Sequence, residues 1–260
     1  MPTLTLQGPR QLELSEDQVD RLHNYAKALS VQELPEGWKP LRNSSRAVIA
    51  HHAKLRLFYK EFAPLTPLER LIALVNGSPI ERLQRQNKLF HHAGFSVPET
   101  LAWGTSINGQ EYLFTREATG HSLRTWLSEL LVSADADTSM LRRRLLDALG
   151  VFTGRLHASG FLPGDMSASE IYAEQIENRF RFTLLNNGKA VKATPPPGRL
   201  LLRNLIEVNM LPSDVVSLSE RMRVFSAWRR QMRELSPIDA KVIATTAYQS
   251  AMQRMQDGRM

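Results

Sequence analysis

The residues best placed to do chemistry follow the clearest predicted helix of the chain. Residues 140–157 carry apolar side chains at intervals of three and four, which predicts an amphipathic helix, and Gly160 follows where helices commonly end. A short apolar turn then leads to Gly164 and Asp165. An aspartate at the start of such a loop can accept a proton from a hydroxyl group. A Gly-Asp pair is also common turn chemistry, so both interpretations stay open.

Phosphoryl transfer would use such an aspartate together with other residues of this chain. The reaction depends on positioning and charge neutralisation, with oxygen ligands for Mg²⁺ and a cation on the nucleotide phosphates. Lys60 can supply the cation if its side of a predicted strand, residues 55–62, faces the ligand. Glu81 can hold Lys60 in place, although a lone glutamate on a helix more often pairs one turn away, here with Arg85.

Two amides follow a later predicted strand. Residues 180–185 are typical of a short strand, and Asn186 and Asn187 come directly after it. Their side-chain oxygens could serve phosphoryl transfer. Two asparagines before Gly188 would ordinarily form a turn, so this alternative stays open as well.

The elements that must position these residues change in type along the chain. Strands are predicted at residues 46–50, 55–62, 97–103, 111–115 and 180–185, and helices at 16–29, 66–75, 80–92, 122–132, 140–157, 200–211 and 218–235. Most strands come first and most helices later, which indicates an α+β fold with two lobes. We expect an N-terminal extension over residues 1–40, a small β-rich lobe over 41–116 and a larger helical lobe over 117–260.

Composition narrows the function classes. The 260 residues are 42% apolar and 23% charged, ordinary values that exclude global disorder. The net charge of +7 favours an acidic partner, which could be nucleic acid, a phosphorylated small molecule or an anionic membrane. The basic residues are spread along the chain without a nucleic-acid module, so we expect no nucleic-acid partner. The absence of cysteine excludes disulfides, thiolate metal sites and a cysteine nucleophile.

Targeting signals are not recognisable in the sequence. The N-terminus lacks a basic start followed by an apolar core, as a signal peptide would have. The longest apolar stretches have about five residues, such as 71–75, whereas a membrane helix needs about 20. We therefore expect a cytoplasmic protein that can still contact a membrane peripherally.

Several ordered motifs together resemble the lipopolysaccharide core kinases, that is the Kdo/WaaP family and especially its InaA-like branch. The strand at residues 58–62, FYKEF, resembles the lysine strand of the family, and residues 93–98, AGFSVP, resemble its "AGxxVP" turn. Residues 154–161, GRLHASGF, are close to the start of its "RLHxxGxxHGDL" motif. The resemblance spans roughly residues 40–235 and implies a bilobal protein-kinase-like fold.

The resemblance also implies a set of roles and ligands. ATP and Mg²⁺ would be the cofactors, with Lys60 on the nucleotide phosphates, Glu81 holding Lys60, and Asp165 orienting the acceptor hydroxyl. The acceptor would be a heptose or Kdo of the lipopolysaccharide core or of its precursor, at the inner face of the cytoplasmic membrane.

The sequence departs from the family pattern at the metal positions. The family's His-Gly-Asp-Leu reads PGDM at residues 163–166. The catalytic-loop asparagine, a metal ligand in the family, falls on Glu170, and the metal-binding aspartate falls on Asn186. Glu170 can hold Mg²⁺ through carboxylate oxygen, whereas the amide oxygen of Asn186 carries no net charge. A Gly-rich phosphate loop is missing, and Arg46 in the corresponding hairpin could touch phosphate instead.

These departures favour weak or absent catalysis over normal catalysis. The favoured hypothesis is a pseudokinase with a binding or regulatory role, which needs no cofactor and has a true core kinase as a candidate partner. The alternative is an active ATP-dependent sugar kinase.

Other polar clusters are given structural interpretations. The arginine runs 142–144 and 229–230 are expected to be solvated helix faces, with contact to a phosphorylated acceptor or anionic lipid headgroups as the alternative. The histidine pairs at 51–52 and 91–92 point away from each other and are not expected to bind metal.

Overall fold

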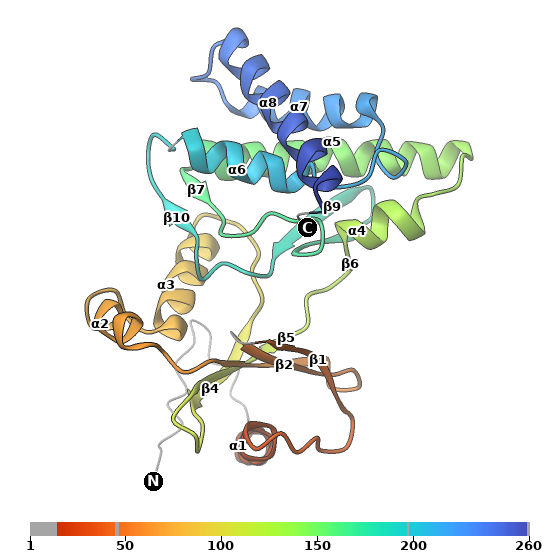
Figure 1. Cartoon of the computed structure of the whole chain (residues 1–260). Coiled ribbons are helices and arrows are strands. Elements are labelled where there is room, and N and C mark those ends of the chain that lie inside the picture. The colour runs from red at the N-terminus through yellow and green to blue at the C-terminus, as the bar shows by residue number, and fades with distance from the viewer. Residues whose placement is uncertain (1–14, 45–46, 197, 259–260) are drawn as a thin grey trace. The chain divides into compact units, whose positions relative to one another are not determined.

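The computed structural model describes residues 15–44, 47–196 and 198–258 (Figure 1). The chain divides into two compact units. The first unit contains the described residues up to Leu89 together with Pro98–Glu117, and the second contains Phe90–Val97 together with the residues from Ala118 onward.

A five-stranded antiparallel sheet forms the centre of the first unit. Its strands follow the order β1 (Trp38–Ser44), β2 (Ala47–His52), β3 (Leu57–Phe62), β5 (Glu111–Arg116) and β4 (Thr100–Thr105). Helix α1 (Glu16–Ser30) lies against one face of this sheet and shares a hydrophobic core with it (Figure 1). The strands predicted at residues 46–50 and 55–62 correspond to the paired β2 and β3, and those predicted at 97–103 and 111–115 to the paired β4 and β5.

Strand β3 shows why Lys60 lies on a particular side of the sheet. Leu57, Tyr59 and Glu61 are buried on the face that carries the core, whereas Lys60 is half-buried and points to the other face, because successive side chains of a strand alternate. Lys60 lies between Ile49 on β2 and Leu113 on β5 in the strand register. The alternation predicted for this strand is confirmed.

Two helices follow β3 in the chain. Thr66 caps α2 (Pro67–Asn76) by accepting a hydrogen bond from the Glu69 amide, and the Glu69 carboxylate accepts one from the Thr66 amide at 2.8 Å. Helix α3 (Pro79–His92) ends before Gly94, whose φ of +79° is a conformation that glycine adopts without strain. Both predicted helices are confirmed.

The second unit is mainly helical. Its longer helices are α5 (Ala136–Ala158), α6 (Gly198–Val208), α7 (Leu218–Gln231) and α8 (Pro237–Gln256), preceded by a short α4 (Leu123–Thr125) and a π-helical turn, η1 (Trp126–Leu130). Its strands form two small sheets, β6 (His121–Ser122) with β8 (Ile171–Ile176) and β9 (Arg179–Leu184), and β7 (Phe161–Leu162) with β10 (Val191–Lys192). No helix within the described ranges is both long and apolar enough to cross a membrane.

Two expectations about helix faces are wrong. The sequence of the helix predicted at 218–235 places Leu218, Met222, Phe225 and Met232 on one apolar stripe. In α7, however, Leu218 and Met222 are 57% and 53% exposed, whereas Arg221 is buried. Arg142 was expected on a solvated face, but its side chain is 14% exposed and donates to the Leu127 carbonyl at 2.8 Å. A guanidinium can be buried in this way because backbone carbonyls satisfy its donors.

Candidate functional site

The loop after β7 carries Asp165 and is held by helix α6. The Pro163 carbonyl accepts a hydrogen bond from Asn204 Nδ2 at 2.9 Å and another from Arg203 Nη2 at 3.1 Å. Asn204 is completely buried, so its amide is shielded from competing water. The start of the loop is fixed as well, because Leu162 is buried in the core.

Glu207 holds the other side of Asp165. Its Oε2 accepts a hydrogen bond from the Met166 amide at 3.0 Å. Burial raises the pKa of the Glu207 carboxyl above its ordinary value, the Met166 hydrogen bond opposes this shift, and the charge of Asp165 adds to it. Asp165 itself accepts a hydrogen bond from the Ser167 amide at 2.9 Å through Oδ1. The loop is therefore tied to α6 on both sides of Asp165.

A buried histidine connects this support to α7. Trp228 Nε1 donates to His157 Nδ1 at 3.0 Å, and both side chains are almost fully buried. Burial lowers the pKa of His157 to about 4, and the Asn204 side chain opposes this shift. His157 is therefore neutral at pH 7, with Nδ1 as the acceptor and the proton on Nε2.

The two expected metal positions lie on neighbouring segments. The Leu185 amide donates to the Glu170 carbonyl at 3.0 Å, which places Asn186 one residue beyond this contact. Glu170 is half-buried and Asn186 is exposed. Asn187 is instead fully buried and donates to the Leu184 carbonyl at 2.9 Å. The backbone segments that carry Glu170 and Asn186 therefore lie side by side at the end of β9.

The donor set at this position suits a divalent cation only weakly. Glu170 supplies one carboxylate and Asn186 one neutral amide oxygen, whereas hard cations prefer several charged oxygens. In the part of the chain that the structure describes, no group of three or more histidine, aspartate or glutamate residues could hold a metal ion. The residues at this position therefore fit a tightly held divalent cation poorly.

The expected nucleotide-binding residues belong to the first unit. The Lys60 ammonium lies 5.1 Å from the centre of the Phe62 ring. Glu81 is exposed, and its carboxylate accepts a hydrogen bond from the Ser78 amide at 2.8 Å, which caps the start of α3. Arg46 lies outside the described residues. The roles assigned to Lys60, Glu81 and Arg46 stay predictions.

Sequence reasoning missed the residues that support the loop. Asn204 and Glu207 were assigned to a helix without any role. The signal was present, because Asn204 lies between Leu201 and Leu205 on the buried face of α6. A polar residue among buried apolar ones must find hydrogen-bond partners, and here the partner is a loop 41 residues earlier in the chain.

Comparisons with known proteins define the fold class. No protein-family model and no curated protein sequence matches this chain. Among solved structures, one described as WaaP in complex with acyl carrier protein matches with a TM-score of 0.61 and 18% identity over 92% of this chain and 98% of that chain. The bifunctional kinase-methyltransferase WbdD matches with a TM-score of 0.46 and 18% identity, over 81% of this chain and 50% of that one.

The chain therefore has an α+β, protein-kinase-like fold. Within that class, its fold is like that of WaaP, as the sequence motifs predicted. At 18% identity the likeness concerns the fold alone.

Proposed function

We propose that this chain is a lipopolysaccharide-kinase-like protein whose phosphoryl transfer is weakened or lost. It acts by binding, as a regulatory component of lipopolysaccharide core biosynthesis. The similarity to the WaaP fold supports the general class. The particular role rests on the residues of the site.

One observation carries the proposal. Glu170 and Asn186 lie on adjacent segments, as two metal ligands of a kinase would, yet the charged oxygen is on the catalytic-loop side and the neutral one follows β9. An amide after β9 binds a divalent cation less strongly than a carboxylate, because its oxygen carries no net charge. Since phosphoryl transfer depends on charge neutralisation by that cation, this exchange weakens transfer.

An active sugar kinase is the second candidate function. Asp165 is held on both sides by α6, and Lys60 is present on β3, so the residues for orienting a hydroxyl and contacting a phosphate are retained. In that case ATP and Mg²⁺ would be the cofactors and a heptose or Kdo the acceptor.

Exchanging the residue types at positions 170 and 186 distinguishes the pseudokinase from the active kinase. We expect the wild-type protein to transfer little labelled phosphate from ATP to purified lipopolysaccharide core, and Glu170→Asn with Asn186→Asp to raise transfer at least about tenfold. Adding Asp165→Ala to the double variant should abolish the gain. A wild-type protein with full kinase activity that the double exchange lowers would contradict the pseudokinase proposal.

The proposal also includes a protein partner and the lipopolysaccharide core as a ligand. The WaaP structure contains acyl carrier protein, which supports a kinase-fold protein of this kind working with a second protein. For this chain we propose a true core kinase as the partner, and the lipopolysaccharide core or its precursor as the ligand they share.

We also propose that the protein is cytoplasmic and contacts the inner face of the cytoplasmic membrane. The support is helix α2, which buries none of its residues. Leu68, Leu71, Ile72 and Val75 recur at helical spacing on one face and are 67%, 63%, 43% and 86% exposed. A short exposed apolar face of this kind suits the boundary between headgroups and acyl chains.

A further inference from the structure

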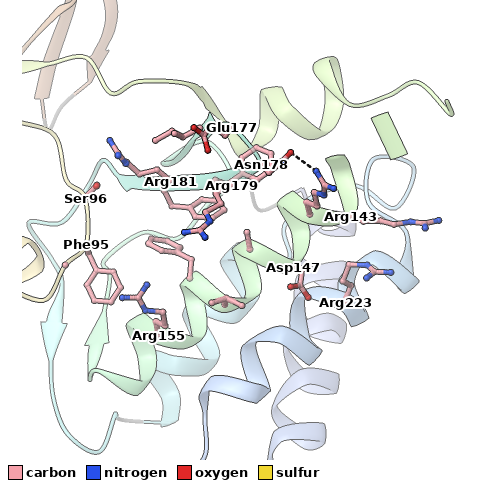
Figure 2. Close-up of a pocket in the computed structure, with 18 of the residues that line it drawn as sticks. Phe95, Ser96, Arg143, Asp147, Arg155, Glu177, Asn178, Arg179, Arg181 and Arg223 are labelled. Atoms are coloured by element: carbon pink, nitrogen blue, oxygen red, sulfur yellow. Dashed lines mark hydrogen bonds between the residues drawn. The ribbon is translucent and has the colours of Figure 1, made fainter. Parts of the chain in front are cut away.

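A wide groove lies on the second unit, between α5, the β8–β9 hairpin and α7. It has a volume of about 1000 Å³. Six of its lining residues are arginines, and none is lysine: Arg143, Arg144, Arg155, Arg179, Arg181 and Arg223. Figure 2 shows five of them by label, with Arg155 beside Phe95 and Arg179 between the hairpin and α5. We call this feature the arginine groove.

The arginines of the groove are largely available to a ligand. Arg143, Arg179 and Arg223 are exposed, and none forms an ion pair with a residue that the structure describes. Two carboxylates line the groove as well, but Asp147 already pairs with Arg230 at 2.8 Å. The groove is therefore strongly positive.

Of the other arginines, Arg181 pairs with Glu174 at 3.8 Å, and Arg144 and Arg155 are held in place by weaker local contacts. Arg144 donates to Asn178 Oδ1 at 3.0 Å, a bond drawn in Figure 2. Arg155 lies 5.7 Å from the centre of the Phe95 ring. A planar guanidinium that is already positioned loses less freedom when it binds a carboxylate in the two-pronged geometry it favours.

The floor of the groove is apolar, and its aromatic rings pack on one another. Phe152 and Phe182 stack on each other with centroids 4.9 Å apart, and Phe95 packs edge-on against Phe152. Phe180 packs edge-on against Trp126. Nucleic-acid bases bind such sites by stacking on exposed rings, so this packing disfavours single-stranded nucleic acid.

The positive charges are spread along the groove rather than gathered at one point. Arg143 and Arg155 are twelve residues apart on α5, which corresponds to about 18 Å. A single lipid headgroup satisfies two or three neighbouring arginines but does not reach both ends. An amphipathic helix of about 12 residues matches the length, with apolar side chains toward the floor and carboxylates toward the arginines.

We propose that the arginine groove binds an acidic amphipathic helical segment of a partner protein. The proposal deepens the protein association proposed above by naming the surface and the chemistry of the partner. It does not depend on phosphoryl transfer, because the groove shares no residue with the Asp165 loop or with the segment around Asn186.

A fluorescence-anisotropy titration tests the proposal on the full-length protein. The probe is a labelled 15-residue helical peptide with leucines on one face and glutamates elsewhere. We expect Arg143→Glu with Arg179→Glu to weaken its binding at least about tenfold, because two attractive charges become repulsive. The matched control is Arg199→Glu with Arg254→Glu, which makes the same charge change at exposed positions outside the groove and should leave binding within about twofold.

Two further peptides test whether binding depends on the apolar face and on the sign of the charge. A scrambled peptide of the same composition, without an apolar face, should bind at least about fivefold more weakly. A peptide with lysine in place of glutamate should bind the Arg143→Glu, Arg179→Glu variant better than the wild type.

Several outcomes would overturn the proposal. Equal loss of binding in the groove and control variants would mean non-specific charge attraction. Equal binding of the scrambled peptide would remove the role of the apolar floor. If 15-nucleotide oligothymidylate or vesicles containing phosphatidylglycerol bind through the groove arginines and the peptide does not, the groove serves nucleic acid or a membrane instead. Kinase assays on the same variants keep this test separate from the proposed function.

Discussion

The loop that carries Asp165 is held in position by side chains of helix α6. Asn204 binds the carbonyl of Pro163, and Glu207 binds the amide of Met166, so the backbone is fixed on both sides of the aspartate. Leaving a buried carbonyl without its donor costs about 1–3 kcal/mol. Loss of either hydrogen bond is therefore expected to loosen the loop around Asp165.

His157 makes the stability of the second unit depend on pH. Its pKa is about 4 in the folded protein, against an ordinary value near 6.5. The unfolded chain therefore binds more protons between these values, so the contribution of His157 is complete above pH 6.5 and is lost as the pH falls towards 4. Glu207 acts in the opposite direction, because burial raises its pKa.

We expect His157 to lower the free energy of unfolding by about 2 kcal/mol between pH 7.5 and pH 5.0. Urea denaturation of the wild type and of His157→Asn at both pH values measures this, because the asparagine Oδ1 takes the place of the Nδ1 acceptor for Trp228 and does not titrate. The wild type should lose more stability than the variant. Equal losses would show that folding does not lower the pKa of His157.

Only part of the site can be predicted at the residue scale. Asp165 follows from a helix stop and a Gly-Asp turn, which are local signals. Asn204 and Glu207 act across the chain, and a pattern on one helix does not reveal which distant loop it supports. The functional roles of Lys60 and Glu81 stay predictions, although the structure shows that Glu81 also caps its own helix.

The contact between α5 and α7 depends on two small residues. A Cβ atom on Gly150 would lie 2.3 Å from the Val224 carbonyl oxygen, and one on Gly154 would lie 2.7 Å from the Trp228 carbonyl oxygen. Side chains at these positions would push the two helices apart. The glycines therefore set the distance at which the core of the second unit packs.

We expect Gly150→Ala to destabilise the protein by about 2–3 kcal/mol, despite the better helix propensity of alanine of about 1 kcal/mol. The control is Gly198→Ala at the start of α6, where a Cβ meets no atom within 4 Å and the backbone is unstrained. Urea denaturation should separate the two clearly. A Gly150→Ala protein as stable as the control would contradict the close packing.

Helix α2 gives a second prediction at this scale. Leu71→Glu should reduce co-sedimentation with anionic vesicles at least about fivefold, because it places a charge on the apolar face. The thermal midpoint should hardly change, since Leu71 is 63% exposed. Ile107→Glu, at an exposed apolar position in the β4–β5 connection, is the matched control. If the two variants lose binding equally, α2 is not the contact.

Elements with strong periodicity were predictable, and those with weak patterns were not. The helices predicted at 140–157 and 218–235 are confirmed as α5 and α7. Strand β1 was missed because Pro40 interrupts it and its residues do not alternate clearly. Helix α8 was missed because its buried face consists of alanines, Ala240, Ala247 and Ala251, which give little contrast in hydrophobicity.

At the scale of the whole molecule, the order of elements indicated the fold class correctly. A sheet early in the chain and helices later are what a kinase-like fold requires, and the WaaP structure matches over most of both chains. The lobe boundaries at residues 41–116 and 117–260 stay a prediction. The residues expected to form the site are divided between the two units, with Lys60 in the first and Asp165, Glu170 and Asn186 in the second.

The structure shows that part of the positive charge of the protein is concentrated in one groove. The sequence showed basic residues spread along the chain, and the arginine runs were expected to be solvated helix faces, with contact to a phosphorylated acceptor or anionic lipid as the alternative. Folding brings arginines from α5, β9 and α7 around one groove, although they are far apart in the sequence. Composition therefore indicated an acidic partner, but only the tertiary structure shows a surface that could receive one.

Calorimetric titration with ATP, with and without Mg²⁺, tests the central claim most directly. We expect the ATP dissociation constant of the wild type to change by less than about threefold when Mg²⁺ is added, because Asn186 is a weak ligand. Asn186→Asp should make binding at least about tenfold tighter in Mg²⁺, whereas Asn178→Asp, the same change on the β8–β9 turn, should not. Wild-type binding that already tightens more than tenfold with Mg²⁺ would contradict the account.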